Sequence, residues 1–148
     1  MSVVPSMTFV TFSPPLKGTP QQGSAFANGA GPCSGTFTDR KGRKHELDGS
    51  NVRYIAWNSG PSSCAEGAAD GGGYLSYSGN KLRFALTETR LGAAAALHFD
   101  GKRSGSANAD ARVSPDTDPA EVARQCLGSG LAQAQVDIDF ATTPAISG

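Results

Sequence analysis

A strict alternation of apolar and polar side chains is the clearest pattern in the chain. In the segment 81–89, every second residue from Leu82 to Leu86 is apolar, and in 131–142 Val136, Ile138 and Phe140 alternate with Asp137 and Asp139. A strand is also predicted at 45–57. Successive side chains of a β-strand point to opposite faces, so this period predicts strands with one buried face.

A further strand is predicted at 7–16, where β-branched and aromatic residues gather before Pro14 and Pro15. Strands are also predicted at 24–39, which glycines interrupt, at 74–78 and 93–99, and at 103–113, which has only small and polar residues before Val113. Tight turns are expected at Ser78–Asn80 and Asp100–Gly101, and the small residues of 58–73 predict a long loop. Consecutive strands joined by short turns indicate an all-β, antiparallel up-and-down meander of about eight strands. Closure into a β-barrel would remove its exposed edges.

One helix is expected before the last strand. Asp118 is a good N-cap, Pro119 suits the first helical position, and Glu121 stands where it can reach back to the N–H of the cap. Gly128 is expected to end the helix in the left-handed conformation. Cys126 then points toward whatever the helix packs against.

Length and charge narrow the possible classes of protein. The chain has 148 residues, which predicts a single β-barrel-like domain over 1–148. Thirteen Lys and Arg balance thirteen Asp and Glu, so there is no electrostatic case for binding nucleic acid or an anionic membrane. No apolar run approaches the roughly 18 residues of a membrane helix, so no membrane span is expected.

Three cysteines lie far apart, without the close spacing of a zinc site, so neither a metal nor another cofactor is expected. Taken alone, they fit either three buried thiols or one disulfide with a cysteine left over. Strands that alternate up and down place the loop with Cys64 and the helix with Cys126 at the same end of the sheet. Cys33 then lies opposite the chain near Met7 or before it. The topology therefore favours a Cys64–Cys126 disulfide.

Several stretches, spread in order over nearly the whole chain, resemble a group of small secreted actinobacterial proteins to which no function is assigned. They are Val10–Leu16, Cys33–Thr38, Leu47–Tyr54, Leu82–Arg90, Asp118–Pro119, Cys126–Leu131 and Pro144–Gly148.

The resemblance implies export, with a signal peptide removed ahead of this chain, and an oxidising location favours the disulfide. Members of the group often have a further cysteine just ahead of the first strand. Val3 and Val4 stand there in this chain, which is consistent with Cys33 having lost a partner.

Candidate catalytic groups are sparse. His98 and Asp100 share one strand face and could support acid–base chemistry, or they could end an exposed polar face. Glu46, Glu66 and Glu88 could contribute to a carboxylate pair for glycoside hydrolysis, but nothing in the sequence selects two of them. No catalytic residue is therefore assigned.

Aromatic residues give a better hint of binding. Tyr54, Trp57, Tyr74 and Tyr77 fall on neighbouring predicted strands, where they either fill the core or in part line a ligand-binding face. We expect an exported, non-enzymatic protein that binds a small ligand or a cell-surface component. The alternatives are a structural or assembly subunit, such as a surface or virion decoration protein, and then an unrecognised hydrolase. The sequence leaves the oligomeric state open.

Overall fold

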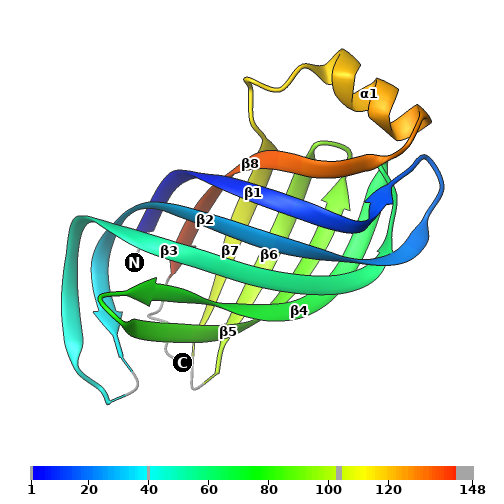
Figure 1. Cartoon of the computed structure of the whole chain (residues 1–148). Coiled ribbons are helices and arrows are strands. Elements are labelled where there is room, and N and C mark those ends of the chain that lie inside the picture. The colour runs from blue at the N-terminus through cyan, green and yellow to red at the C-terminus, as the bar shows by residue number, and fades with distance from the viewer. Residues whose placement is uncertain (1, 40, 103–104, 143–148) are drawn as a thin grey trace.

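Eight antiparallel strands close into a barrel in the computed structural model, which describes residues 2–39, 41–102 and 105–142 (Figure 1). Each strand pairs with its neighbours in the chain, and the last strand pairs with the first. The strands are β1 (Ser2–Leu16), β2 (Gln21–Thr38), β3 (Lys44–Ser62), β4 (Glu66–Tyr77), β5 (Asn80–Leu91), β6 (Ala94–Gly101), β7 (Ser106–Val113) and β8 (Leu131–Thr142). The predicted all-β meander is confirmed.

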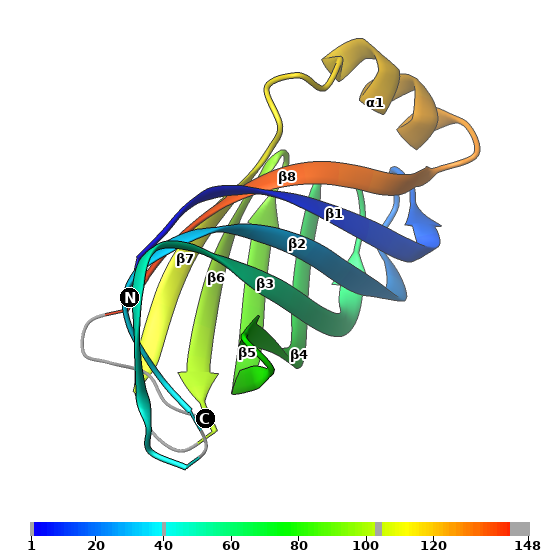
Figure 2. The same cartoon turned by 60° about the vertical axis from the view of Figure 1, so that its left-hand side comes forward.

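One helix, α1 (Pro119–Leu127), lies between β7 and β8 at one end of the barrel (Figure 2). The turns that join β1 to β2, β3 to β4 and β5 to β6 lie at the same end. The short helix expected near the C-terminus is therefore confirmed. At the opposite end, β2 runs past the first residues of β1, where Cys33 pairs in register with Val3.

The period of two along each strand separates the inside of the barrel from its outside. Leu82, Phe84 and Leu86 are buried, whereas the intervening Arg83 and Thr87 are exposed. The alternation therefore identifies the inner face.

The prediction of a long loop over 58–73 is wrong, because most of this segment forms strands. β3 continues to Ser62, β4 begins at Glu66, and only three residues form the turn between them. Glycines allow the two strands to approach closely: a Cβ added at Gly71 would lie 1.8 Å from the carbonyl oxygen of Trp57. Tertiary pairing outweighs the low strand propensity of glycine here.

The helix begins as expected and ends differently. Asp118 is the N-cap and its side chain accepts a hydrogen bond from the backbone N–H of Ala120 at 3.0 Å. Glu121 does not reach back to the cap, because its carboxylate pairs with Arg124 and accepts from Gln125. The left-handed residue is not Gly128, whose φ is −105°; a positive φ of 104° occurs later, at Gly130.

Of the two predicted tight turns, the first is confirmed and the second is displaced. Ser78 and Gly79 turn between β4 and β5 with φ values of 49° and 81°. Asp100–Gly101 is still part of β6, because Gly101 pairs with Phe84 of β5. The turn to β7 follows after Gly101.

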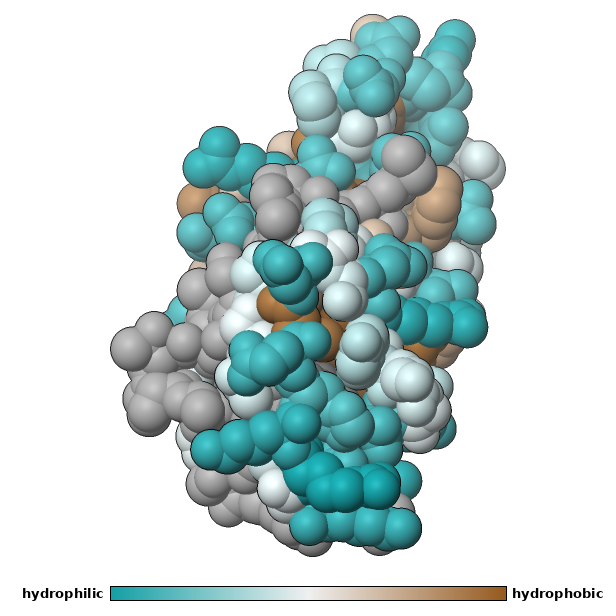
Figure 3. Space-filling model, turned by 90° about the vertical axis from the view of Figure 1, so that its left-hand side faces the viewer, coloured by the Kyte–Doolittle hydropathy of each residue, from teal (hydrophilic) through white to brown (hydrophobic). Residues whose placement is uncertain are grey.

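One face of the molecule is mainly polar. The face shown in Figure 3 is mostly hydrophilic, with hydrophobic residues exposed only in small areas. Within the described ranges, no helix is both long and apolar enough to cross a membrane.

Candidate functional site

The half of the barrel nearest α1 contains a partly open cavity of about 490 Å³. Six inward positions there carry alanine, whose single methyl group leaves space along the barrel axis. These are Ala25, Ala27, Ala56, Ala95, Ala111 and Ala134. Larger apolar side chains, including Val10, Leu86 and Ile138, complete the wall. An eight-stranded barrel is either filled by its own side chains or holds one small ligand, and this half has room for a ligand.

The Tyr54 ring lines the cavity and packs against two further buried rings, Phe84 and Phe99. Phe84 and Phe99 meet edge to face with centroids 4.8 Å apart, and Tyr54 stacks on Phe84 at 6.0 Å. Burial raises the pKa of the Tyr54 hydroxyl, and the nearby charge of Glu88 raises it further. Below these rings the barrel is filled by Leu47, Val52, Leu75 and Leu82, among other buried side chains.

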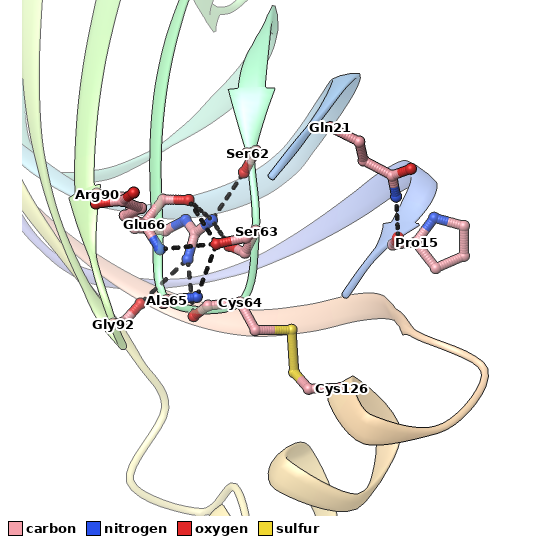
Figure 4. The surroundings of a disulfide bond; sticks show 10 residues. All are labelled: Pro15, Gln21, Ser62, Ser63, Cys64, Ala65, Glu66, Arg90, Gly92 and Cys126. Atoms are coloured by element: carbon pink, nitrogen blue, oxygen red, sulfur yellow. Dashed lines mark hydrogen bonds between the residues drawn. A yellow bond between two sulfur atoms is a disulfide. The ribbon is translucent and has the colours of Figure 1, made fainter. Parts of the chain in front are cut away.

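Helix α1 covers the other end of the cavity. Pro119, Val122 and Cys126 line the cavity from the helix side, and no residue of α1 is buried. The Cys64–Cys126 disulfide ties the helix to the turn between β3 and β4 (Figure 4). The predicted disulfide is confirmed.

The turn that anchors the helix is itself firmly held. The backbone N–H of Cys64 donates to the carbonyl of Lys17, and that of Gly92 donates to the carbonyl of Ala65. Arg90 donates from its two terminal nitrogens to the backbone carbonyls of Ser63, Cys64, Glu66 and Gly92 and to the Ser62 hydroxyl (Figure 4). Arg90 therefore fixes the turn at the mouth of the cavity.

Two polar side chains meet on the apolar wall. Asn58 Nδ2 donates to Glu88 Oε2 at 2.6 Å, and both residues line the cavity. Glu88 also influences its neighbours on the inner face: burial lowers the pKa of the Arg90 guanidinium, and the charge of Glu88 opposes that shift. A few polar groups within an apolar wall are typical of small-molecule sites.

The structure separates the four aromatic residues singled out in the sequence. Tyr54 lines the cavity, and Tyr77 packs inside the barrel at the opposite end, near His45. Trp57 borders the cavity, but its side chain is 49% exposed on the outside of the barrel, opposite Phe26. Tyr74 also faces outward, with Lys81 Nζ 4.4 Å from its ring centroid.

Sequence reasoning did not single out Glu88 and Asn58 as a pair on the cavity wall. A signal for Glu88 was available, because it continues the inward series of Leu82, Phe84 and Leu86 by one further step of two. A carboxylate on the inner face of an alternating strand is unusual. Its pairing with Asn58 joins β3 to β5 across β4 and has no counterpart in sequence spacing.

His98 and Asp100 do form a pair, with His98 Nε2 3.3 Å from Asp100 Oδ1. His98 Nδ1 also lies 2.8 Å from Asn108 Oδ1, and this hydrogen bond is the largest cause of a raised His98 pKa. Both members of the pair are substantially exposed on the outside of the barrel, and neither lines the cavity. The pair therefore lies on the outer surface, away from the cavity.

At the end of the barrel away from α1, a second polar cluster holds the turn between β2 and β3. Asp39 is buried and accepts hydrogen bonds from the backbone N–H groups of Lys41 and Arg43 and from the Arg43 side chain. Its Oδ2 also lies 3.0 Å from His45 Nε2. These contacts, with the His45 bond first, hold the pKa of the Asp39 carboxyl below its usual range. The cluster is structural, because its bonds close the turn.

No group of His, Cys, Asp or Glu side chains in the described part of the chain is arranged to hold a metal ion. A scan against protein-family models, a search of curated proteins and a search of solved structures gave no match for this chain.

Proposed function

We propose that this protein binds a small, mainly apolar molecule inside the barrel, beneath α1, and acts by binding rather than by catalysis. The observation that supports the proposal is the cavity of about 490 Å³ with its belt of alanines. Its volume lies within the roughly 300–1,000 Å³ typical of small-molecule sites.

The two ends of the barrel differ in a way that supports ligand binding. The half away from α1 is filled by Phe84, Phe99 and the side chains around them, which stabilise the fold. The half under α1 lacks such packing, although larger side chains at its alanine positions would bury more apolar surface and stabilise the fold further. A ligand in the cavity would restore the missing contacts.

The groups that face the cavity suit recognition better than catalysis. Neither His45 nor His98 lines the cavity, and the terminal nitrogens of Arg90 already hold the turn below the helix. Asn58 and Glu88 remain as a hydrogen-bonding pair that can orient a polar group of the ligand.

We further propose that the protein works outside the cytoplasm. The Cys64–Cys126 disulfide supports this location, because such bonds persist in oxidising compartments. The resemblance to small secreted actinobacterial proteins agrees with it.

The binding proposal is tested by titration with N-phenylnaphthylamine, a neutral dye that fluoresces in apolar surroundings. The unmodified protein should give a saturable signal with one site. Ala95→Phe places a ring in the cavity and should abolish the signal. Ala96→Phe adds the same ring to the exposed face of the same strand and should leave it unchanged. A lack of saturable binding, or equal binding by both variants, would contradict the proposal.

A second candidate, assembly with further copies of the chain, rests on a strip of exposed aromatic residues. Phe9, Phe26 and Trp57 lie on the outside of β1, β2 and β3 and are 51%, 47% and 49% exposed. Phe26 pairs in register with Trp57, and Phe9 lies diagonally across from Phe26. A net charge of zero adds no repulsion between copies.

Sedimentation velocity over a range of concentrations tests this second candidate. Trp57 is the single tryptophan, so its accessibility to acrylamide should fall as the protein associates. Trp57→Ser should keep the protein monomeric in sedimentation. A concentration-independent monomer with an accessible Trp57 would exclude self-assembly through this strip.

A further inference from the structure

Among the described residues, Glu88 is the only acidic one that lines the cavity. It occupies an inward position of β5, one step beyond Leu86, and is only partly exposed. Oε2 accepts from Asn58, whereas Oε1 has no hydrogen bond within the described residues, and Glu88 forms no ion pair with them. A carboxylate in apolar surroundings is costly unless a donor or a cation satisfies it.

The neighbouring ionisable groups do not satisfy it. Arg90 is next on the same inner face, but both its terminal nitrogens donate to the turn at the cavity mouth, and Nε alone has no bond in the described part. Tyr54 is kept neutral, because burial and the charge of Glu88 both raise the pKa of its hydroxyl. The free oxygen of Glu88 is thus left for a molecule that enters the cavity.

We propose that the ligand of this cavity carries a protonated amine, and that the amine pairs with the Glu88 carboxylate while an apolar body fills the space among the alanines. This inference rests on the proposed function and specifies its ligand class. An ammonium group supplies both the hydrogen bond that Oε1 lacks and the opposite charge. A carboxylate ligand would instead face the like charge of Glu88, and the cationic groups left to meet it are Nε of Arg90 and the exposed Arg112, which also lines the cavity.

The apolar body of such a ligand would reach Tyr54. Glu88 and Tyr54 both line the cavity, and the Tyr54 ring is backed by the rings of Phe84 and Phe99. A molecule anchored at Glu88 therefore extends over apolar surface toward these rings, or toward Val122 on the helix side. The class that fits is a compact alkyl or aryl amine.

The test compares three probes that share one apolar chain: octylamine, octanol and octanoic acid, by calorimetric titration at neutral pH. Octylamine is expected to bind about tenfold to one-hundredfold more tightly than octanol, the range for a hydrogen bond to a charged group. Octanoic acid is expected to bind more weakly than octanol, because its charge repels that of Glu88.

Glu88→Gln keeps the size of the side chain and an oxygen for Asn58 but removes the charge. It should reduce the affinity for octylamine to about that for octanol, and saturable binding of N-phenylnaphthylamine by the variant shows that its cavity is intact. Asp70→Asn makes the same chemical change on the exposed face of β4 and should alter neither affinity.

Equal binding of the three probes, or full octylamine binding by Glu88→Gln, would overturn this inference and leave the binding proposal standing. Failure of all three probes would overturn it as well. The proposed function falls with it only when N-phenylnaphthylamine also fails to bind.

Discussion

The disulfide between Cys64 and Cys126 allows a quantitative prediction. Replacing both cysteines by serine removes a cross-link between residues 62 positions apart. The entropy of closing a loop of that length is worth about 4 kcal/mol at room temperature in the chain-entropy model. That value is an upper bound, because α1 buries no residue and becomes freer in the folded variant too.

We therefore expect the double variant to lose about 3 kcal/mol of unfolding free energy, which corresponds to roughly 10 °C in Tm for a chain of this size. Urea unfolding followed by far-ultraviolet circular dichroism measures the loss. The reduced, unmodified protein is the matched control, since it loses the cross-link without a change of sequence. The double variant and the reduced protein should unfold at the same urea concentration, which should be lower than that for the oxidised protein.

A second readout separates the helix from the barrel. Without the disulfide, the amides of α1 should exchange with solvent much faster, while those of β4 and β5 stay protected. Trypsin should also cleave after Arg124 before it cuts the barrel. Unfolding midpoints equal to that of the oxidised protein, or unchanged exchange in α1, would refute the view that this bond is the main attachment of the helix.

Three further predictions follow from single residues. Cys33 is 1% exposed and burial raises the pKa of its thiol to about 11, so it should react with Ellman's reagent only after unfolding; rapid reaction of the native protein would contradict this. Asp39→Asn should destabilise the protein most at neutral pH and progressively less below about pH 4. The pKa of the Asp39 carboxyl is lower in the folded protein than in the unfolded chain, so the ionised carboxylate stabilises the fold at neutral pH, and this contribution is lost as the carboxylate is protonated. Urea midpoints of the unmodified protein and the variant over a pH series measure the effect, and a difference between the two midpoints that does not depend on pH would contradict it. Gly71→Ala should lower the free energy of unfolding by about 2 kcal/mol or more, because its Cβ would overlap the carbonyl oxygen of Trp57. Gly18→Ala places its Cβ in open space and should leave the free energy of unfolding nearly unchanged in the same assay.

Local patterns in the sequence were sufficient to predict most of the elements. The period of two from Leu82 to Leu86 depends only on strand geometry, and the start of α1 depends on Asp118 and Pro119 next to the first turn. The common end of Cys64 and Cys126 followed from the alternation of strand directions. Each of these inferences needs only residues that are close in sequence, or the order of the elements.

The strand pairing over 58–73 depended on tertiary structure. Gly71 and Gly73 have low strand propensity, and nothing nearby in the sequence shows that the backbone of β3 passes close enough to require them. Once the two strands are paired, the absence of a Cβ is what allows the approach. Glycine thus indicates a loop when the sequence is read locally, whereas in the folded protein it is the residue that this close pairing of strands requires.

The cavity was likewise decided by the tertiary structure. Alternation places Ala27, Ala95 and Ala111 on inner faces, but an inward alanine can lie against a large neighbour or beside open space. The cavity exists because closure of the barrel brings these three alanines, from β2, β6 and β7, around the same part of its interior, where their short side chains leave space unfilled. In the same way, alternation alone turns Glu88 inward, and only the packing of the other seven strands determines that it faces a space large enough for a ligand.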